Sequence, residues 1–292
     1  MLIDTHCHLD APEFDADRDA VITAARQAGL GAIVVPAVFR RNWDTVQALA
    51  EREPDVWFAL GLHPLYVNDA GPDDLEHLRQ RVMAVRDHPR FVGIGEIGLD
   101  YFVPGLDPAR QQAVFEAQVR LAAEFGLPVI LHTRRSVDAV TKQLRRFRPP
   151  SGIAHAFNGS PQQAQHLVGL GMAIGFGGAM TFDRARNIRR LAASLPAESL
   201  VLETDAPDIS PAWVHPGRNQ PAELTRIAQV LAELRGLSLE AVAELTTLNA
   251  RRVLPALRLP GSGAPANLGS DWGRSGLNAS LSRPASKNQT SI

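Results

Sequence analysis

LIDTHCH, residues Leu2–His8, is a short apolar strand that runs directly into two histidines. Side chains two residues apart on an extended segment point to the same face, roughly 6–7 Å apart along the strand. His6 and His8 therefore face the same way, while Cys7 between them turns away and is interpreted as a packing residue. If this strand ends at the mouth of a barrel, both imidazoles can bind one cation. The pair alone also fits two ordinary surface histidines, so the interpretation depends on the rest of the chain.

The same pattern, an apolar run of strand length followed by a helical stretch, recurs along the chain. The predicted strands are Leu2–His6, Ala32–Pro36, Trp57–Leu62, Phe91–Ile97, Pro128–His132, Gly152–His155, Met172–Phe176 and Leu200–Thr204. The predicted helices between them are Asp17–Ala28, Asp73–Val85, Pro108–Phe125, Val137–Phe147, Gln162–Leu170 and Arg184–Ala193. Eight β-then-α units in about 255 residues predict a (β/α)8 TIM barrel of class α/β. A doubly wound open sheet would need a Gly-rich phosphate turn after its first strand, and none is present there.

The end of the chain differs in character from the barrel. Pro221–Leu234 and Leu239–Leu248 are expected to form extra C-terminal helices. A Gly/Ser/Pro/Asn-rich run with almost no apolar periodicity then continues to Ile292. Such composition predicts a disordered tail. We therefore predict a barrel domain over residues 1–258 and a tail over residues 259–292.

Composition narrows the class of protein. The chain has 292 residues, of which 45% are hydrophobic, and a formal net charge of −1. This small net charge argues against a protein that binds long duplex nucleic acid through its overall positive charge. A few basic side chains near a site suffice to bind short oligonucleotides. No apolar run approaches the ~20 residues needed to span a bilayer, and no signal peptide is visible. Together with the single cysteine, Cys7, this predicts a cytoplasmic protein with no membrane association, and no protein partner is implied.

Six candidate metal ligands fall where the predicted strands end. In this fold the active site lies at the carboxyl ends of the strands. His132 alone would fit a buried histidine bonded to the backbone. Glu96 and Asp205 are harder to dismiss, because a carboxylate in apolar surroundings needs a partner to offset its desolvation. The six are His6, His8, Glu96, His132, His155 and Asp205.

Four imidazoles and two carboxylates exceed what one tetrahedral zinc requires, but they suit two divalent cations about 3.5–4 Å apart. One group must then bridge the pair. A carboxylated lysine is nearly excluded, because Lys142 is the only lysine of the barrel and lies in the middle of a predicted helix. Glu96 remains as the bridge. Mixed nitrogen and oxygen ligands accept zinc, manganese, nickel or magnesium.

Six motifs occur in order, and together they resemble the TatD family of metal-dependent hydrolases, within the amidohydrolase superfamily. The motifs are Ile3–His8, Gly61–Pro64, Gly95–Tyr101, Leu131–Arg134, His155–Gly159 and Glu203–Pro207. The resemblance covers roughly residues 1–258. It departs from the family at the closing helix, which reads Asn249–Leu254 where Phe is common at its end, and in the long tail.

The resemblance implies a first metal held by His6, His8, Glu96 and Asp205, and a second held by Glu96, His132 and His155. It also implies a deoxyribonuclease, often a 3′→5′ exonuclease on single strands. Deacylation of mischarged tRNA is attached to some members of the family.

The residues and the resemblance meet in metal-assisted hydrolysis. Asp205 is predicted to take the proton of the attacking water as a general base. Arg134 is predicted to bind a substrate phosphate. His63 is predicted to donate to a substrate phosphate, with a structural loop contact as the alternative. Glu203 is predicted either to contact the substrate or to support the metal ligands. Arg135 is read as an ordinary solvated helix start. Asn219 fits either a loop cap or a site residue, and the sequence leaves this open.

Three classes of function follow from these residues. We favour a phosphodiester hydrolase that acts on DNA, most simply on single strands. An ester or amide hydrolase, such as an aminoacyl-tRNA deacylase, fits the same metal ligands. A non-catalytic binding protein on the same scaffold is the third, and the intact set of six ligands argues against it.

Overall fold

A computed structural model describes residues 1–259, in which eight parallel strands lie in the order β1 to β8. The strands are β1 (Leu2–Asp4), β2 (Leu30–Pro36), β3 (Val56–Leu60), β4 (Phe91–Asp100), β5 (Val129–Arg134), β6 (Gly152–Ala154), β7 (Met172–Phe176) and β8 (Leu200–Leu202). The amide of Thr5, the residue after β1, donates to the carbonyl of Leu202, the last residue of β8, over 3.1 Å. This bond joins the first strand to the last, so the predicted (β/α)8 barrel is confirmed.

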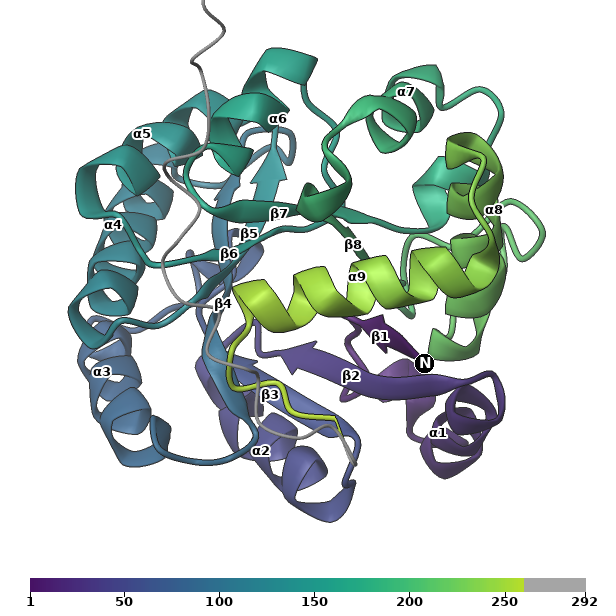
Figure 1. Cartoon of the computed structure of the whole chain (residues 1–292). Helices are drawn as coiled ribbons and strands as arrows, with labels where there is room; N and C mark the ends of the chain where they lie inside the picture. The colour runs from purple at the N-terminus through teal and green to yellow at the C-terminus, as the bar shows by residue number, and fades with distance from the viewer. Residues whose placement is uncertain (260–292) are drawn as a thin grey trace, which may run out of the picture. The chain divides into compact units, whose positions relative to one another are not determined.

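Helices alternate with the strands and surround the barrel (Figure 1). They are α1 (Arg18–Gln27), α2 (Trp43–Arg52), α3 (Asp74–Val85), α4 (Pro108–Phe125), α5 (Val137–Phe147), α6 (Pro161–Val168), α7 (Arg186–Ser194), α8 (Leu224–Arg235) and α9 (Leu239–Val253). Helix α2 was not among the predicted helices, although its buried face has helical spacing and consists of Trp43, Val46, Leu49 and Ala50. Within residues 1–259, no helix is both long and apolar enough to cross a bilayer.

The amino-terminal end of the barrel is closed by α9, which lies across it in Figure 1. Inward-facing apolar residues such as Ile3, Ile130 and Val201 form one buried cluster with Val253 and Leu254 from the end of α9. Leu259 also belongs to this cluster and is only 7% exposed. The barrel therefore includes Leu259, which the sequence analysis placed in the tail. The rest of the predicted tail lies outside the described residues.

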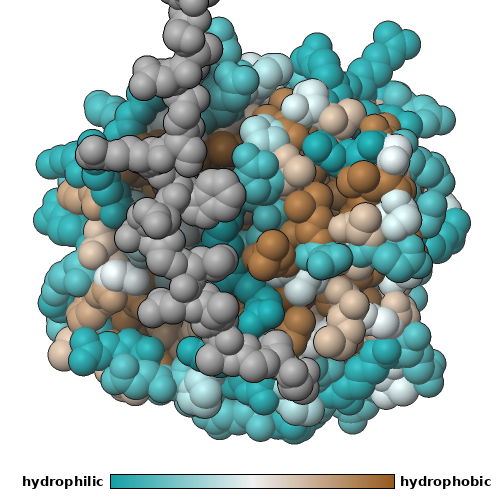
Figure 2. Space-filling model, viewed as in Figure 1, coloured by the Kyte–Doolittle hydropathy of each residue, from teal (hydrophilic) through white to brown (hydrophobic). Residues whose placement is uncertain are grey.

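The outer surface at this end carries several exposed apolar side chains. Figure 2, in the same view, shows apolar residues gathered over α8 and α9. Met1 and Leu248 are 67% and 62% exposed and line one shallow hollow beside α9. The titratable residues singled out from the sequence lie at the opposite end of the strands, where they form a cluster.

Candidate metal centre

The predicted ligands all lie at the carboxyl end of the barrel. His6 and His8 follow β1 directly, because the strand ends at Asp4 and not at His6 as expected. Glu96 lies on β4 and His132 on β5, while His155 follows β6 and Asp205 follows β8. The backbone amide of Asp205 donates to the carbonyl of His6 over 2.8 Å. The first and last strands thus bring residues about two hundred positions apart into one site.

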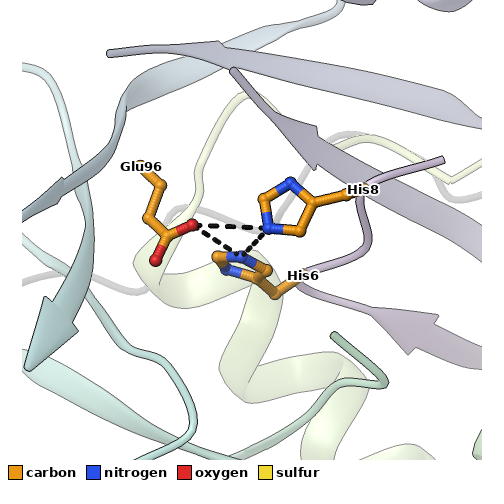
Figure 3. A group of neighbouring side chains, drawn as sticks. All are labelled: His6, His8 and Glu96. Carbon is orange, nitrogen blue, oxygen red and sulfur yellow. Dashed lines mark hydrogen bonds and ion pairs between the residues drawn. The ribbon is translucent and has the colours of Figure 1, made fainter. Parts of the chain in front are cut away.

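Glu96 lies at the middle of the cluster and is 2% exposed. Its Oε2 atom is 3.2 Å from Nε2 of His6 and 3.5 Å from Nε2 of His8 (Figure 3). Its Oε1 atom is 2.8 Å from Nε2 of His155 and 3.1 Å from Nδ1 of His132. Each carboxylate oxygen therefore faces a different group of imidazoles, and a third imidazole, that of His63, also lies near Oε1.

Asp205 lies on the same side of Glu96 as the first pair of histidines. Its Oδ1 atom is 3.5 Å from Nε2 of His6 and 3.6 Å from Nε2 of His8. The backbone at Asp205 has φ 57°, in the left-handed region that few residues other than glycine adopt. Strain of this kind is typical of functional sites, where surrounding contacts hold it in place.

His63 lies in the ligand cluster, although the sequence analysis expected it to contact the substrate. Its imidazole is 5% exposed, and Nε2 is 3.1 Å from Oε1 of Glu96. The other ring nitrogen accepts a hydrogen bond from the amide of Leu65. His63, Glu96 and His132 have ligand atoms within 4.8 Å of one another. A direct role at a metal is thus as well supported as a substrate contact.

Glu203 was also expected to contact the substrate or support the ligands, and it is 1% exposed. Its Oε1 atom accepts a hydrogen bond from the amide of Ala156 and lies 3.8 Å from Nδ1 of His155. A Cβ atom at Gly175 would come within 2.2 Å of the Glu203 carboxylate, so this glycine makes the space for it. Burial raises the pKa of Glu203 to about 8. Glu203 therefore lies behind His155, close to its Nδ1 atom but without a hydrogen bond to it.

Asp100 is a site residue that the sequence analysis did not single out. It is 1% exposed, and its Oδ2 atom is 3.0 Å from Nε2 of His132. A carboxylate on the far nitrogen of a ligating histidine fixes its tautomer and orientation. Asp100 lies at the end of the same strand as Glu96, and the Gly95–Tyr101 motif already contained it. The position of Asp100 in that motif could therefore have indicated its role from the sequence.

Asp4 and Asn219 hold the loops on which the site is built. The carboxylate of Asp4 accepts bonds from the amide and hydroxyl of Thr204 and from the amide of His6. Asn219 is buried, and its side-chain amide donates to the carbonyls of Thr204 and Asp208. Asn219 is therefore a loop-holding residue, which resolves the alternative that the sequence left open.

Glu96 controls the electrostatics of the cluster. Burial alone would raise the pKa of Glu96, but the imidazoles of His63, His155 and His6 outweigh it and hold the pKa well below its usual range. Burial would also lower the pKa values of His8 and His155. Glu96 outweighs it there and raises them to about 9 and about 10. Burial lowers the pKa values of His6 and His63, so the positive charge beside the ionised Glu96 lies on His8 and His155.

The donor set fits divalent cations. Among residues 1–259, three overlapping groups of ligand atoms lie within 4.8 Å: His6 with His8 and Glu96, His6 with His155 and Asp205, and His63 with Glu96 and His132. Ligating imidazoles must be neutral, so a bound cation takes the place of the protons that Glu96 otherwise attracts. Within residues 1–259, a carboxylated lysine is not available as the bridge, because the one lysine there, Lys142, lies exposed on α5, outside the barrel.

Arg134 and Arg135 follow His132 at the rim and are both exposed. Their guanidinium carbons lie 3.9 and 4.6 Å from the ring centre of Phe102. Within residues 1–259, neither arginine has a carboxylate partner within 4.0 Å. Tyr101 and Phe102 are themselves 42% and 45% exposed. Cations and aromatic rings therefore lie together beside the buried ligands.

Comparisons with known proteins agree with this site. The model of the TatD related DNase family matches residues 3–255. An Escherichia coli protein named uncharacterized metal-dependent hydrolase YjjV is 43% identical over 245 residues, which is 83% of this chain and 93% of the relative. A protein of Erwinia tasmaniensis named 3'-5' ssDNA/RNA exonuclease TatD is 33% identical over 86% of this chain and 99% of its own.

Solved structures give the same result. The crystal structure of Escherichia coli YjjV, described as a TatD homologue, superposes with a TM-score of 0.83 at 41% identity, and the match covers 87% of this chain and 98% of that one. Family members are metal-dependent hydrolases, and the buried imidazoles and carboxylates are groups that bind divalent metals. This chain belongs to the TatD family of metal-dependent hydrolases.

Proposed function

We propose that this protein is a two-metal deoxyribonuclease that removes nucleotides from single-stranded DNA in the 3′→5′ direction. In this proposal one divalent cation is held by His6, His8, Glu96 and Asp205. The second is held by Glu96, His132 and His155, with His63 within reach. The cations are zinc, manganese, nickel or magnesium, all of which accept mixed nitrogen and oxygen ligands. A cytoplasmic location belongs to the same proposal, because the single cysteine is a free thiol.

The observation that carries the proposal is the position of Glu96. Its Oε2 atom faces the imidazoles of His6 and His8, and its Oε1 atom faces those of His63, His132 and His155, all at 2.8–3.5 Å. A carboxylate in that position is suited to bridge two cations. Paired cations stabilise both the attacking and the leaving oxygen of an in-line displacement at phosphorus.

The rim favours a phosphodiester over an acyl substrate. Arg134 and Arg135 have no carboxylate to neutralise them in the described part of the chain, so they are available to a phosphate. Exposed Tyr101 and Phe102 beside them offer rings on which unpaired bases stack. The Erwinia relative is named as an exonuclease on single-stranded DNA and RNA.

The chain's own residues divide the work of hydrolysis. When bound, the cations lower the pKa of a ligated water toward ~7 and neutralise charge on the phosphoryl group. Asp205 accepts the proton of the attacking water, and burial raises the pKa of this carboxyl, which makes it a better base. Arg134 orients the phosphate from the rim. Asp100 keeps His132 in position through its far nitrogen, and the buried side chain of Glu203 lies behind His155.

The test is a side-by-side assay of protein reconstituted with each of the four metals. The substrates are end-labelled single-stranded DNA, the same strand in a duplex, and an aminoacyl-tRNA. We expect a ladder of products shortened from the 3′ end of the single strand, with slower cleavage of the duplex. Asp87→Asn, which removes an exposed carboxylate after α3, is the control variant and should behave as wild type.

Two results would contradict the proposal. Release of the amino acid from tRNA without cleavage of DNA would make the protein an ester hydrolase. Binding of the single strand with no cleavage under any metal would favour a binding protein on the same scaffold.

A further inference from the structure

A second cavity opens at the carboxyl end of the barrel, outside the ligand cluster. It has a volume of about 580 Å³ and lies between the loop after β7 and the loop after β8. Ala179, Phe182 and Arg184 line one wall, and Asp208, Ile209 and His215 line the other. Pockets of about 300–1,000 Å³ are typical of small-molecule sites. The cavity is therefore large enough for a ligand of nucleotide size.

The cavity lies next to the proposed metal centre. Pro207 and Asp208 belong to its wall and follow Asp205 by two and three residues. The amide of Asp208 donates to the carbonyl of Asp205 over 2.9 Å. A substrate whose reacting bond lies at Asp205 therefore has its neighbouring unit close to this cavity.

The two loops are fastened to each other, so the cavity is already formed in the absence of ligand. Gly178 packs so closely on the second loop that a Cβ atom there would lie 2.0 Å from the carbonyl oxygen of Ile209. The hydroxyl of Thr181 accepts a bond from the amide of Ala212 over 2.8 Å. Within the second loop, Asn219 donates to the carbonyl of Asp208 and holds that wall in shape.

Ile209 is held in an unusual conformation at this wall. Its φ is 40°, although a β-branched residue rarely adopts the left-handed region, and 38% of the side chain is exposed. The bonds from Asn219 and the contact with Gly178 hold the backbone there. Strained residues that surrounding contacts hold in place gather at ligand sites.

The chemistry of the walls is that of a nucleotide site. The rings of Phe182 and His215 lie 5.6 Å apart at 82°, and Ile209 adds an apolar side chain. Arg184 lies 5.2 Å from the ring centre of Phe182, and in the described part of the chain it has no carboxylate within 4.0 Å. Asp208 supplies a hydrogen-bond acceptor on the side of the metal centre.

We infer that this cavity binds one nucleotide of the substrate strand, adjacent to the nucleotide whose phosphodiester bond is cleaved. The base packs against Phe182, Ile209 and His215, and the phosphate on the far side pairs with Arg184. Asp208 accepts a hydrogen bond from the sugar or base and keeps phosphate away from its own wall by like charge. The inference rests on the proposed function, because it deepens the choice of substrate at that site.

The test compares substrates with and without a nucleoside, using the full-length, metal-loaded protein. The substrates are a single-stranded oligothymidylate and bis(p-nitrophenyl) phosphate, which has no base or sugar. In Phe182→Ala with His215→Ala, the ratio of kcat/KM for the first to that for the second should fall about tenfold, as expected for lost stacking on one base. Arg145→Gln, which removes an exposed arginine of α5, should leave this ratio unchanged.

A binding measurement separates this inference from the proposed function. Fluorescence anisotropy of a labelled oligothymidylate is followed with metal-loaded Asp205→Asn protein, which binds without turnover. Adding Phe182→Ala and His215→Ala should weaken binding about tenfold, and thermal melting confirms that each variant is folded. Phe182→Leu, which keeps apolar volume, is the second variant and should give a smaller loss.

Three outcomes are informative. A reduced ratio with weaker binding supports the cavity as a nucleotide subsite. An unchanged ratio and unchanged binding, in a protein that does cleave DNA, would overturn the subsite and leave the proposed function standing. A wild-type protein that cleaves only bis(p-nitrophenyl) phosphate and does not bind the oligonucleotide would overturn both.

Discussion

The two ends of the barrel contrast in what they bury. At the amino-terminal end, inward-facing residues such as Ile130, Ile153 and Val201 pack against the end of α9. Two residues further along the same chain segments are His132, His155 and Glu203, which are all at the opposite end. Because side chains alternate along a strand, a step of two residues keeps the same inward face.

Residues that stabilise the fold and residues that form the metal site therefore lie at opposite ends of the same barrel. The apolar end contributes through burial and packing, and its buried cluster is built from hydrophobic side chains. The polar end holds carboxylates and imidazoles that are costly to bury. The desolvation cost of these groups is offset by their mutual pairing or by a bound cation. Substitutions at the two ends should therefore have different signatures.

The largest expected effect is at the polar end. Asp205→Asn keeps an oxygen at that position but removes nearly all basicity. The turnover number should fall by about 10²–10⁴-fold, the range for a lost general base, while KM for DNA changes much less. Steady-state kinetics with measured metal content checks this. Near-normal turnover with full metal occupancy would mean that another group, such as Glu203 or His63, takes the proton.

At the apolar end, Leu254→Ala should reduce stability instead. Leu254 is fully buried at the end of α9, so its truncation should cost about 2–5 kcal/mol in the free energy of unfolding. Activity per folded molecule should stay close to wild type at low temperature. Chemical denaturation measures the loss. Leu248→Ala, on the same helix but 62% exposed, is the control and should cost less than about 0.5 kcal/mol.

A smaller effect is expected at the rim, where the polar end meets solvent. Arg134→Gln should raise KM for single-stranded DNA severalfold and flatten the salt dependence of binding by about one phosphate contact. Titrations at several salt concentrations measure the slope. Arg135→Gln tests the reading of Arg135 as an ordinary helix start, and a loss equal to that of Arg134→Gln would assign both arginines to the substrate.

Much of this site could be predicted from the sequence, because most of its residues lie at or just after the carboxyl ends of the strands. The strand pattern fixes the barrel, and the barrel fixes which ends of the strands converge. His63 was harder, because it lies in a loop whose direction depends on packing against Glu96. Asp100 was visible only as part of a motif. The cavity between Phe182 and His215 depends on contacts between two loops, such as that of Gly178, and no periodicity encodes them.

The central claim is that Glu96 bridges two cations. The direct measurement is the metal content per chain, by elemental analysis after reconstitution and removal of loosely bound metal. We expect two equivalents in the wild-type protein and a loss at both sites in Glu96→Gln, because no lysine of the barrel can replace the bridge. Glu124→Gln, an exposed carboxylate of α4, should retain both equivalents. Two full equivalents in folded Glu96→Gln would contradict the bridging role.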